Sequence, residues 1–156
     1  MVSGSLEVQN GEIRAFAESQ SRLPEAMDGE GGWLLPGLIE LHTDNLDKFF
    51  TPRPKVDWPA HSAMSSHDAL MVASGITTVL DAVAIGDVRD GGDRLENLEK
   101  MINAIEETQK RGVNRAEHRL HLRCELPHHT TLPLFEKLVQ REPVTLVSLM
   151  DHSPGQ

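Results

Sequence analysis

Hydrophobic and polar positions alternate along residues 6–17, which read LEVQNGEIRAFA. The Asn10-Gly11 pair in the middle of this stretch is the strongest short signal for a two-residue β turn. We therefore expect two antiparallel strands joined at this pair. They predict a small N-terminal β segment over residues 1–33, an incomplete β-sandwich.

Four later stretches are rich in hydrophobic or β-branched residues, and each predicts a strand. Residues 33–41 are hydrophobic almost throughout, which is typical of a parallel strand buried on both faces. The other three are residues 75–83 (GITTVLDAV), 118–126 (HRLHLRCEL) and 144–152 (VTLVSLMDH).

Helical patterns separate these strands. The helices are expected over residues 67–74, with Ser65 or Ser66 as the N-cap, over residues 93–112, and over residues 132–142. Residues 51–61 contain three prolines and predict a loop. Strands alternating with helices indicate βαβ units, so the fold class is α/β with about four parallel strands over residues 34–156.

The composition limits the classes of function. The chain has 156 residues and a formal net charge of −9, which argues against binding to nucleic acid or to an anionic membrane. A small phosphorylated ligand remains compatible with this charge. One cysteine, no membrane-spanning run and no signal region predict a cytoplasmic protein.

Chemically active side chains follow three of the four predicted strands. His42 and Asp44 lie on one face of an extended segment, with Cα atoms about 6.6 Å apart. Glu125 ends the third strand and His152 follows the fourth. Each of these three strand ends, taken alone, is explained by polar residues that cap a strand. Parallel α/β folds, however, build their sites at the carboxyl ends of their strands. Together the residues predict a divalent metal site, with Zn or Mn as the ion.

The remaining candidates are weaker. Lys48 and Arg53 could contact an anion, and so could His128 and His129 just beyond Glu125, although a solvated loop explains the first two equally well. His61 and His67 are either surface residues or site residues. His118 and His121 are expected to decorate a strand, and Cys124 to be a packed thiol.

The strings LLPGLIELHTD and GITTVLD, after a β segment with NGEI, resemble the opening of the amidohydrolase superfamily, metal-dependent hydrolases on a (β/α)8 barrel. Most members carry His-x-His on the first strand, whereas this chain has His-x-Asp. That departure, with HLRCELP and LMDHSPGQ, is similar to a branch that hydrolyses a phosphorylated ribose phosphonate and releases pyrophosphate in phosphonate catabolism.

The resemblance implies that His42, Asp44 and His152 bind one or two divalent ions, which Glu125 bridges. It implies attack of a metal-activated hydroxide on phosphorus, with Lys48 and Arg53 as substrate contacts. A whole barrel needs about 250 residues. We therefore expect the first half of an enzyme, catalytically inactive alone, whose main acid or base lies elsewhere, with exposed sheet edges that favour self-association. Two alternatives remain open, a non-catalytic metal-binding half-barrel module and an amidohydrolase that cleaves a C–N bond.

Overall fold

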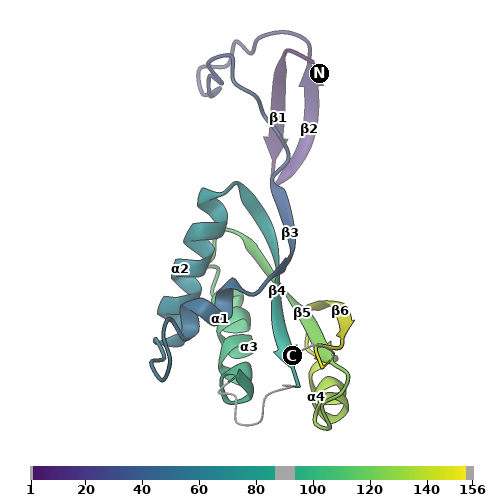
Figure 1. The fold of residues 1–156 in the computed structure, drawn as a ribbon. Coiled ribbons are helices and arrows are strands. Elements are labelled where there is room, and N and C mark those ends of the chain that lie inside the picture. The colour runs from purple at the N-terminus through teal and green to yellow at the C-terminus, as the bar shows by residue number, and fades with distance from the viewer. Residues whose placement is uncertain (1, 87–93, 154–156) are drawn as a thin grey trace. The chain divides into compact units, whose positions relative to one another are not determined.

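A computed structural model of the chain describes residues 2–86 and 94–153. The chain forms two compact units, Met1–Pro36 and Gly37–Gln156 (Figure 1). The first contains a two-stranded antiparallel sheet and the second a four-stranded parallel half-barrel sheet with helices. The α/β class predicted from the sequence is confirmed.

The first unit is a hairpin of β1 (Ser5–Gln9) and β2 (Glu12–Ala17). Asn10 has φ 53° and Gly11 has φ 77°. Positive φ at both central residues fits a tight turn whose twist matches that of the flanking strands. The hairpin predicted from the Asn-Gly pair is therefore confirmed.

The sheet of the second unit has the strand order β3-β4-β5-β6, so each strand pairs with the next one along the chain. All three pairings are parallel, and the carboxyl ends of the four strands therefore lie at the same edge of the sheet. The strands are β3 (Leu38–Thr43), β4 (Ile76–Ile85), β5 (Glu117–Glu125) and β6 (Val144–Met150).

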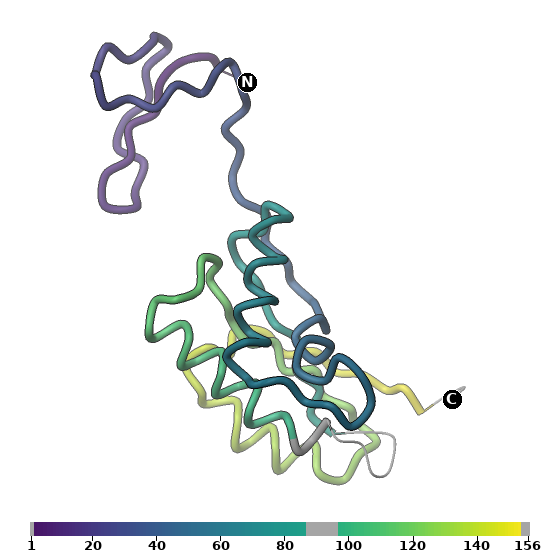
Figure 2. Tube along the Cα trace, turned by 90° about the vertical axis from the view of Figure 1, so that its left-hand side faces the viewer, coloured from purple at the N-terminus to yellow at the C-terminus, as the bar shows by residue number. Residues whose placement is uncertain are grey.

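The helices are α1 (Asn45–Phe50), α2 (Ala60–Ala73), α3 (Arg94–Lys110) and α4 (Thr131–Leu138). Each contributes buried side chains to one core that also contains residues of β4 and β5. In α3, Leu98, Ile102 and Ile105 recur at helical spacing and are buried. Figures 1 and 2 show α1, α2 and α3 together on one side of the sheet.

Side chains of β5 alternate between the two faces of the sheet. Leu120, Leu122 and Cys124 enter the core beneath the helices, which we call the helix face. The odd-numbered residues from Arg119 to Glu125 lie on the opposite side, which we call the open face. The alternation therefore separates the apolar core from the polar side chains of this strand.

Three local expectations were wrong. The first strand begins at Leu38 instead of residue 33, and it is an exposed edge strand, since it is hydrogen-bonded to β4 alone. Helix α2 begins at Ala60, so Ser65 and Ser66 lie inside it and do not cap it. The short helix α1 was not expected, because it has neither a side-chain N-cap nor a long hydrophobic repeat.

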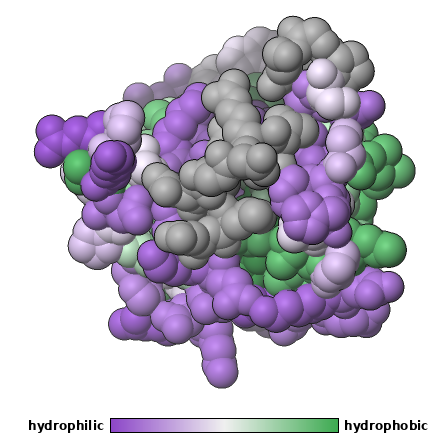
Figure 3. Space-filling model, turned by 60° about the horizontal axis from the view of Figure 1, so that its bottom comes forward, coloured by the Kyte–Doolittle hydropathy of each residue, from purple (hydrophilic) through white to green (hydrophobic). Residues whose placement is uncertain are grey.

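The exposed strands leave hydrophobic side chains in contact with solvent. Ile39 of β3 and Leu149 of β6 are 62% and 69% exposed. Seen from the end toward which β4 runs, the surface is mainly hydrophilic, with hydrophobic side chains gathered along one side (Figure 3). No helix in the described residues is long and apolar enough to cross a membrane.

Candidate metal centre at the strand ends

His42 and Asp44 lie at the carboxyl end of β3, as the sequence predicts. His42 is the fifth residue of β3 and Asp44 precedes α1. His42 Nε2 lies 3.8 Å from Asp44 Oδ2, too far for a hydrogen bond. Two ligand atoms, each about 2.1 Å from one ion, would lie roughly 3.4 Å apart in a tetrahedral site. This separation therefore suits two ligands of one ion after a small adjustment.

Glu125 and His152 form the second pair, at the ends of β5 and β6. His152 Nδ1 donates to both carboxylate oxygens of Glu125, at 2.7 and 2.9 Å. Glu125 is buried, while His152 is partly exposed. A metal ion at this pair would have to replace the shared proton.

Arg123 lies between the two pairs. Its Nη1 donates to Asp44 Oδ1 at 2.7 Å, and its Nε lies 3.9 Å from Glu125 Oε1. The side chain crosses over β4, whose register partner for Arg123 is Ala84. A small side chain on the intervening strand leaves room for this crossing. The guanidinium of Arg123 thus donates a hydrogen bond to Asp44 and forms a longer ion pair with Glu125.

His121 packs against His42 on the open face of the sheet. Its ring meets the ring of His42 edge-on, with centroids 4.9 Å apart. Its Nδ1 lies 3.1 Å from the Leu41 carbonyl oxygen and its Nε2 lies 2.8 Å from Ser148 Oγ. Burial lowers the pKa of His121, and the Leu41 carbonyl only partly offsets this. The side chain was expected to decorate a strand, but it packs beneath His42.

The donor types at these strand ends suit a divalent ion, although the four side chains do not form one group at metal-ligand spacing in the described residues. Two imidazoles and two carboxylates suit Zn or Mn. The buried Nε of Arg123 has no hydrogen-bond partner in the structure, so the polar groups here are incompletely satisfied. His42, Asp44, Glu125 and His152 stay predicted ligands, placed as two pairs with Arg123 between them.

The predicted substrate contacts lie in different places. Lys48 is exposed on α1, and Arg53 is exposed in a loop, where its backbone forms an isolated bridge with Val56. His128 and His129 follow Glu125, and their rings stack with centroids 4.6 Å apart. The His128 backbone N–H donates to the Glu125 carbonyl, which places this histidine pair beside the strand ends. The histidine pair is therefore linked directly to a predicted metal ligand.

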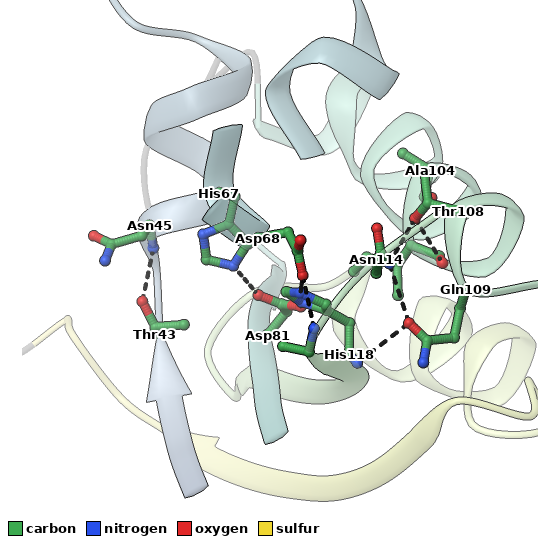
Figure 4. A network of polar contacts seen from close by, with 12 residues as sticks. Thr43, Asn45, His67, Asp68, Asp81, Ala104, Thr108, Gln109, Asn114 and His118 are labelled. Carbon is green, nitrogen blue, oxygen red and sulfur yellow. Dashed lines mark hydrogen bonds and ion pairs between the residues drawn. The ribbon is translucent and has the colours of Figure 1, made fainter. Parts of the chain in front are cut away.

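A second polar cluster lies on the helix face (Figure 4), and of its members the sequence left only His67 open as a site residue. Asp81 of β4 bonds His67 Nε2 at 2.6 Å and His118 Nδ1 at 2.8 Å. His118 Nε2 lies 3.1 Å from Asp68 Oδ1, and Asp68 accepts the backbone N–H groups of Arg115 and Ala116. We call His67, Asp68, Asp81 and His118 the buried network.

Charges in the buried network stabilise one another. Burial alone would lower the pKa of His118, but hydrogen bonds and charge from Asp81 and then Asp68 raise it. Burial alone would raise the pKa of Asp81, but His118 and His67 lower it. The pKa of Asp68 is also lowered, because backbone N–H groups and His118 outweigh its burial. These directions describe a protonated His118 held between two carboxylates.

Three members of the buried network could also hold a metal ion. Ligand atoms of His67, Asp81 and His118 all lie within 4.8 Å of one another, the one such group of three in the described residues. The contacts between them are 2.6 and 2.8 Å, hydrogen-bond lengths like those between His152 and Glu125, so an ion at either place would have to replace the shared protons. As it stands, we interpret the buried network as a set of hydrogen bonds and ion pairs in which the buried Nδ1 of His67 has no partner within the described part of the chain.

The buried network should make stability depend on pH. The raised pKa of His118 stabilises the fold below the ordinary histidine pKa of about 6.5, and this is lost as pH rises through the raised value. The lowered pKa values of Asp68 and Asp81 stabilise it above about 3.9, and this is lost as pH falls through the lowered values. The contribution should be greatest between about pH 4 and 6.5.

Urea unfolding of the wild type and of His118→Gln between pH 4 and 9 would measure this contribution. The difference in free energy of unfolding between the two proteins should shrink as the pH rises above about 6.5. A difference that stays constant over this range would contradict the protonated state of His118.

No family model matches the chain, and no solved structure matches it. Over all 156 residues the chain is 99% identical to the alpha-D-ribose 1-methylphosphonate 5-triphosphate diphosphatase of Escherichia coli (strain K12). This match confirms the resemblance to the branch that hydrolyses a phosphorylated ribose phosphonate. The chain is nearly identical to a stretch of that diphosphatase that makes up 41% of its length.

Proposed function

We propose that the chain supplies the first four barrel strands and part of the metal centre of a diphosphatase acting on alpha-D-ribose 1-methylphosphonate 5-triphosphate. The observation that carries this proposal is the 99% identity, together with the two acid–histidine pairs at the strand ends. The reaction would release pyrophosphate and leave the 5-phosphate. Phosphonate catabolism is the corresponding cellular role.

The open face supports this chemistry. His42, Asp44, Glu125 and His152 would hold one or two divalent ions, zinc or manganese by their donor set. Such an ion neutralises charge that develops on phosphoryl oxygens during hydrolysis. His128 and His129 would meet an anionic substrate beside Glu125, and Lys48 and Arg53 would contact its outer part.

Half-barrel geometry predicts how the chain behaves alone. β3 and β6 are the outer strands of the sheet, and exposed parallel edges favour pairing with another chain. We expect a cytoplasmic protein that self-associates through these edges. We expect little or no catalysis without the strands that complete the barrel.

Complementation tests the proposal. The 156-residue chain would be co-expressed with a second chain carrying the rest of the Escherichia coli relative, and pyrophosphate release would be measured. We expect release from the mixture and little or none from either chain alone. Equal release by the 156-residue chain alone would contradict the predicted inactivity. No release from a complex that forms and binds metal would contradict the diphosphatase assignment.

The same mixture of chains, tested with other measurements, distinguishes the alternatives. Release of ammonia or an amine from an amide substrate would favour an amidohydrolase that cleaves a C–N bond. A stable oligomer that binds metal but supports no hydrolysis in the mixture would favour a non-catalytic half-barrel module.

A further inference from the structure

Arg123 occupies the position that an ion shared by the two acid–histidine pairs would need. Its guanidinium donates to Asp44 at 2.7 Å and lies within 4 Å of Glu125, which itself bonds His152. Its side chain is only 12% exposed. A single ion that contacted both carboxylates would therefore displace this guanidinium.

Several N–H donors of the Arg123 guanidinium also have no hydrogen-bond partner in the described part of the chain. Arginine has five N–H donors, and among the described residues the structure shows one hydrogen bond from Arg123, to Asp44. The Nε is buried without a partner, and its distance of 3.9 Å to Glu125 exceeds hydrogen-bond length. An unsatisfied buried donor weakens the present arrangement. The group is thus held by one hydrogen-bonded ion pair to Asp44 and a longer ion pair to Glu125, and it has donors left for another ligand.

We infer that Arg123 and a divalent ion compete for Asp44, and that the displaced guanidinium then binds an oxyanion of the phosphoryl or phosphonate class. This inference rests on the proposed function and adds a residue to its substrate contacts. The planar guanidinium fork matches the geometry of such oxyanions, because it can donate two parallel hydrogen bonds. Metal and oxyanion should therefore bind with positive coupling. The metal ion frees the guanidinium to bind the oxyanion, and the oxyanion holds the guanidinium away from Asp44.

Arg119 provides a matched control. It lies four residues earlier on β5 and on the same open face, but its guanidinium is half exposed and pairs with Glu117. No contact joins it to Asp44 or Glu125 among the described residues. Arg119→Gln therefore removes the same charge from the same strand without touching the predicted centre.

Calorimetric titration with Mn²⁺ would test the competition in the wild type, Arg123→Gln and Arg119→Gln, after circular dichroism confirms folding. We expect Arg123→Gln to bind Mn²⁺ at least about tenfold more tightly, because a cation within 4 Å of the site is removed. Arg119→Gln should match the wild type. Equal or weaker binding by Arg123→Gln would overturn the inference.

Adding methylphosphonate, a weak chelator, would test the oxyanion contact. It should tighten Mn²⁺ binding by the wild type and by Arg119→Gln, but not by Arg123→Gln. Coupling that persists in Arg123→Gln would overturn the oxyanion role. Absence of Mn²⁺ binding in all three folded proteins would reject the metal centre of the proposed function, whereas equal binding in all three would reject only the role of Arg123.

Discussion

Replacing Asp81 by alanine should lower the free energy of unfolding by about 3–5 kcal/mol. Asp81 is fully buried and bonds both His67 and His118. Without it, protonated His118 would keep only Asp68 as a partner, and His67 would lose its bond at Nε2. Removing one of the two carboxylates that face a buried charge costs more than the lost hydrogen bonds alone.

An exposed pair of the same chemistry provides the control for this prediction. His61 and Glu107 also form a histidine–carboxylate contact at 2.8 Å, but both side chains are more than half exposed. Glu107→Ala should change stability by at most about 1 kcal/mol. Chemical unfolding of the two variants at pH 6 measures both values. A similar small loss in both would show that the buried network contributes no more than a surface ion pair.

The second large effect concerns the open face. We expect the purified chain to carry close to one divalent ion after gel filtration, and the double variant Asp44→Ala with Glu125→Ala to carry none. The two substitutions remove one carboxylate from each acid–histidine pair, leaving His42 and His152 as isolated imidazoles. Two separated imidazoles do not provide the three or four ligands of a stable site.

Asp151→Asn is the matched control for the metal measurement. Asp151 precedes His152, but its carboxylate bonds Ser153, which also lowers its pKa. Metal content should be unchanged in this variant. Metal retained by the double variant would show that the strand-end residues are polar caps and not ligands. A folded and monodisperse wild type without metal would show either that they are polar caps or that the ligands need the missing strands.

Short-range patterns made much of the fold predictable. The Asn10-Gly11 turn, the alternation of strands with helices, and the stripe of α3 all concern neighbouring residues, and the structure contains each of them. Hydrophobicity over residues 33–41 was misleading, because Leu38 and Ile39 stay exposed on an edge strand. A hydrophobic run predicts what a segment could bury, not whether a neighbour covers it.

The buried network shows why part of the polar architecture was missed. His67 and His118 lie in different elements, and only tertiary packing brings both to Asp81. One signal was present in the sequence. His118 is in phase with Leu120 and Leu122, which places it on the helix face and away from solvent. Arg123 is in phase with Glu125, which places both on the open face.

This alternation along β5 has a consequence for how the sequence can change. Even-numbered positions contribute to the core or to the buried network, and odd-numbered positions lie on the open face, where Arg123 and Glu125 are next to the candidate metal centre. Inserting one residue near the middle of β5 would turn all later side chains to the opposite face. Leu122 would leave the core, and Arg123 would be driven under the helices. Point substitutions can therefore alter one role of this strand at a time, whereas a change in its length would damage both.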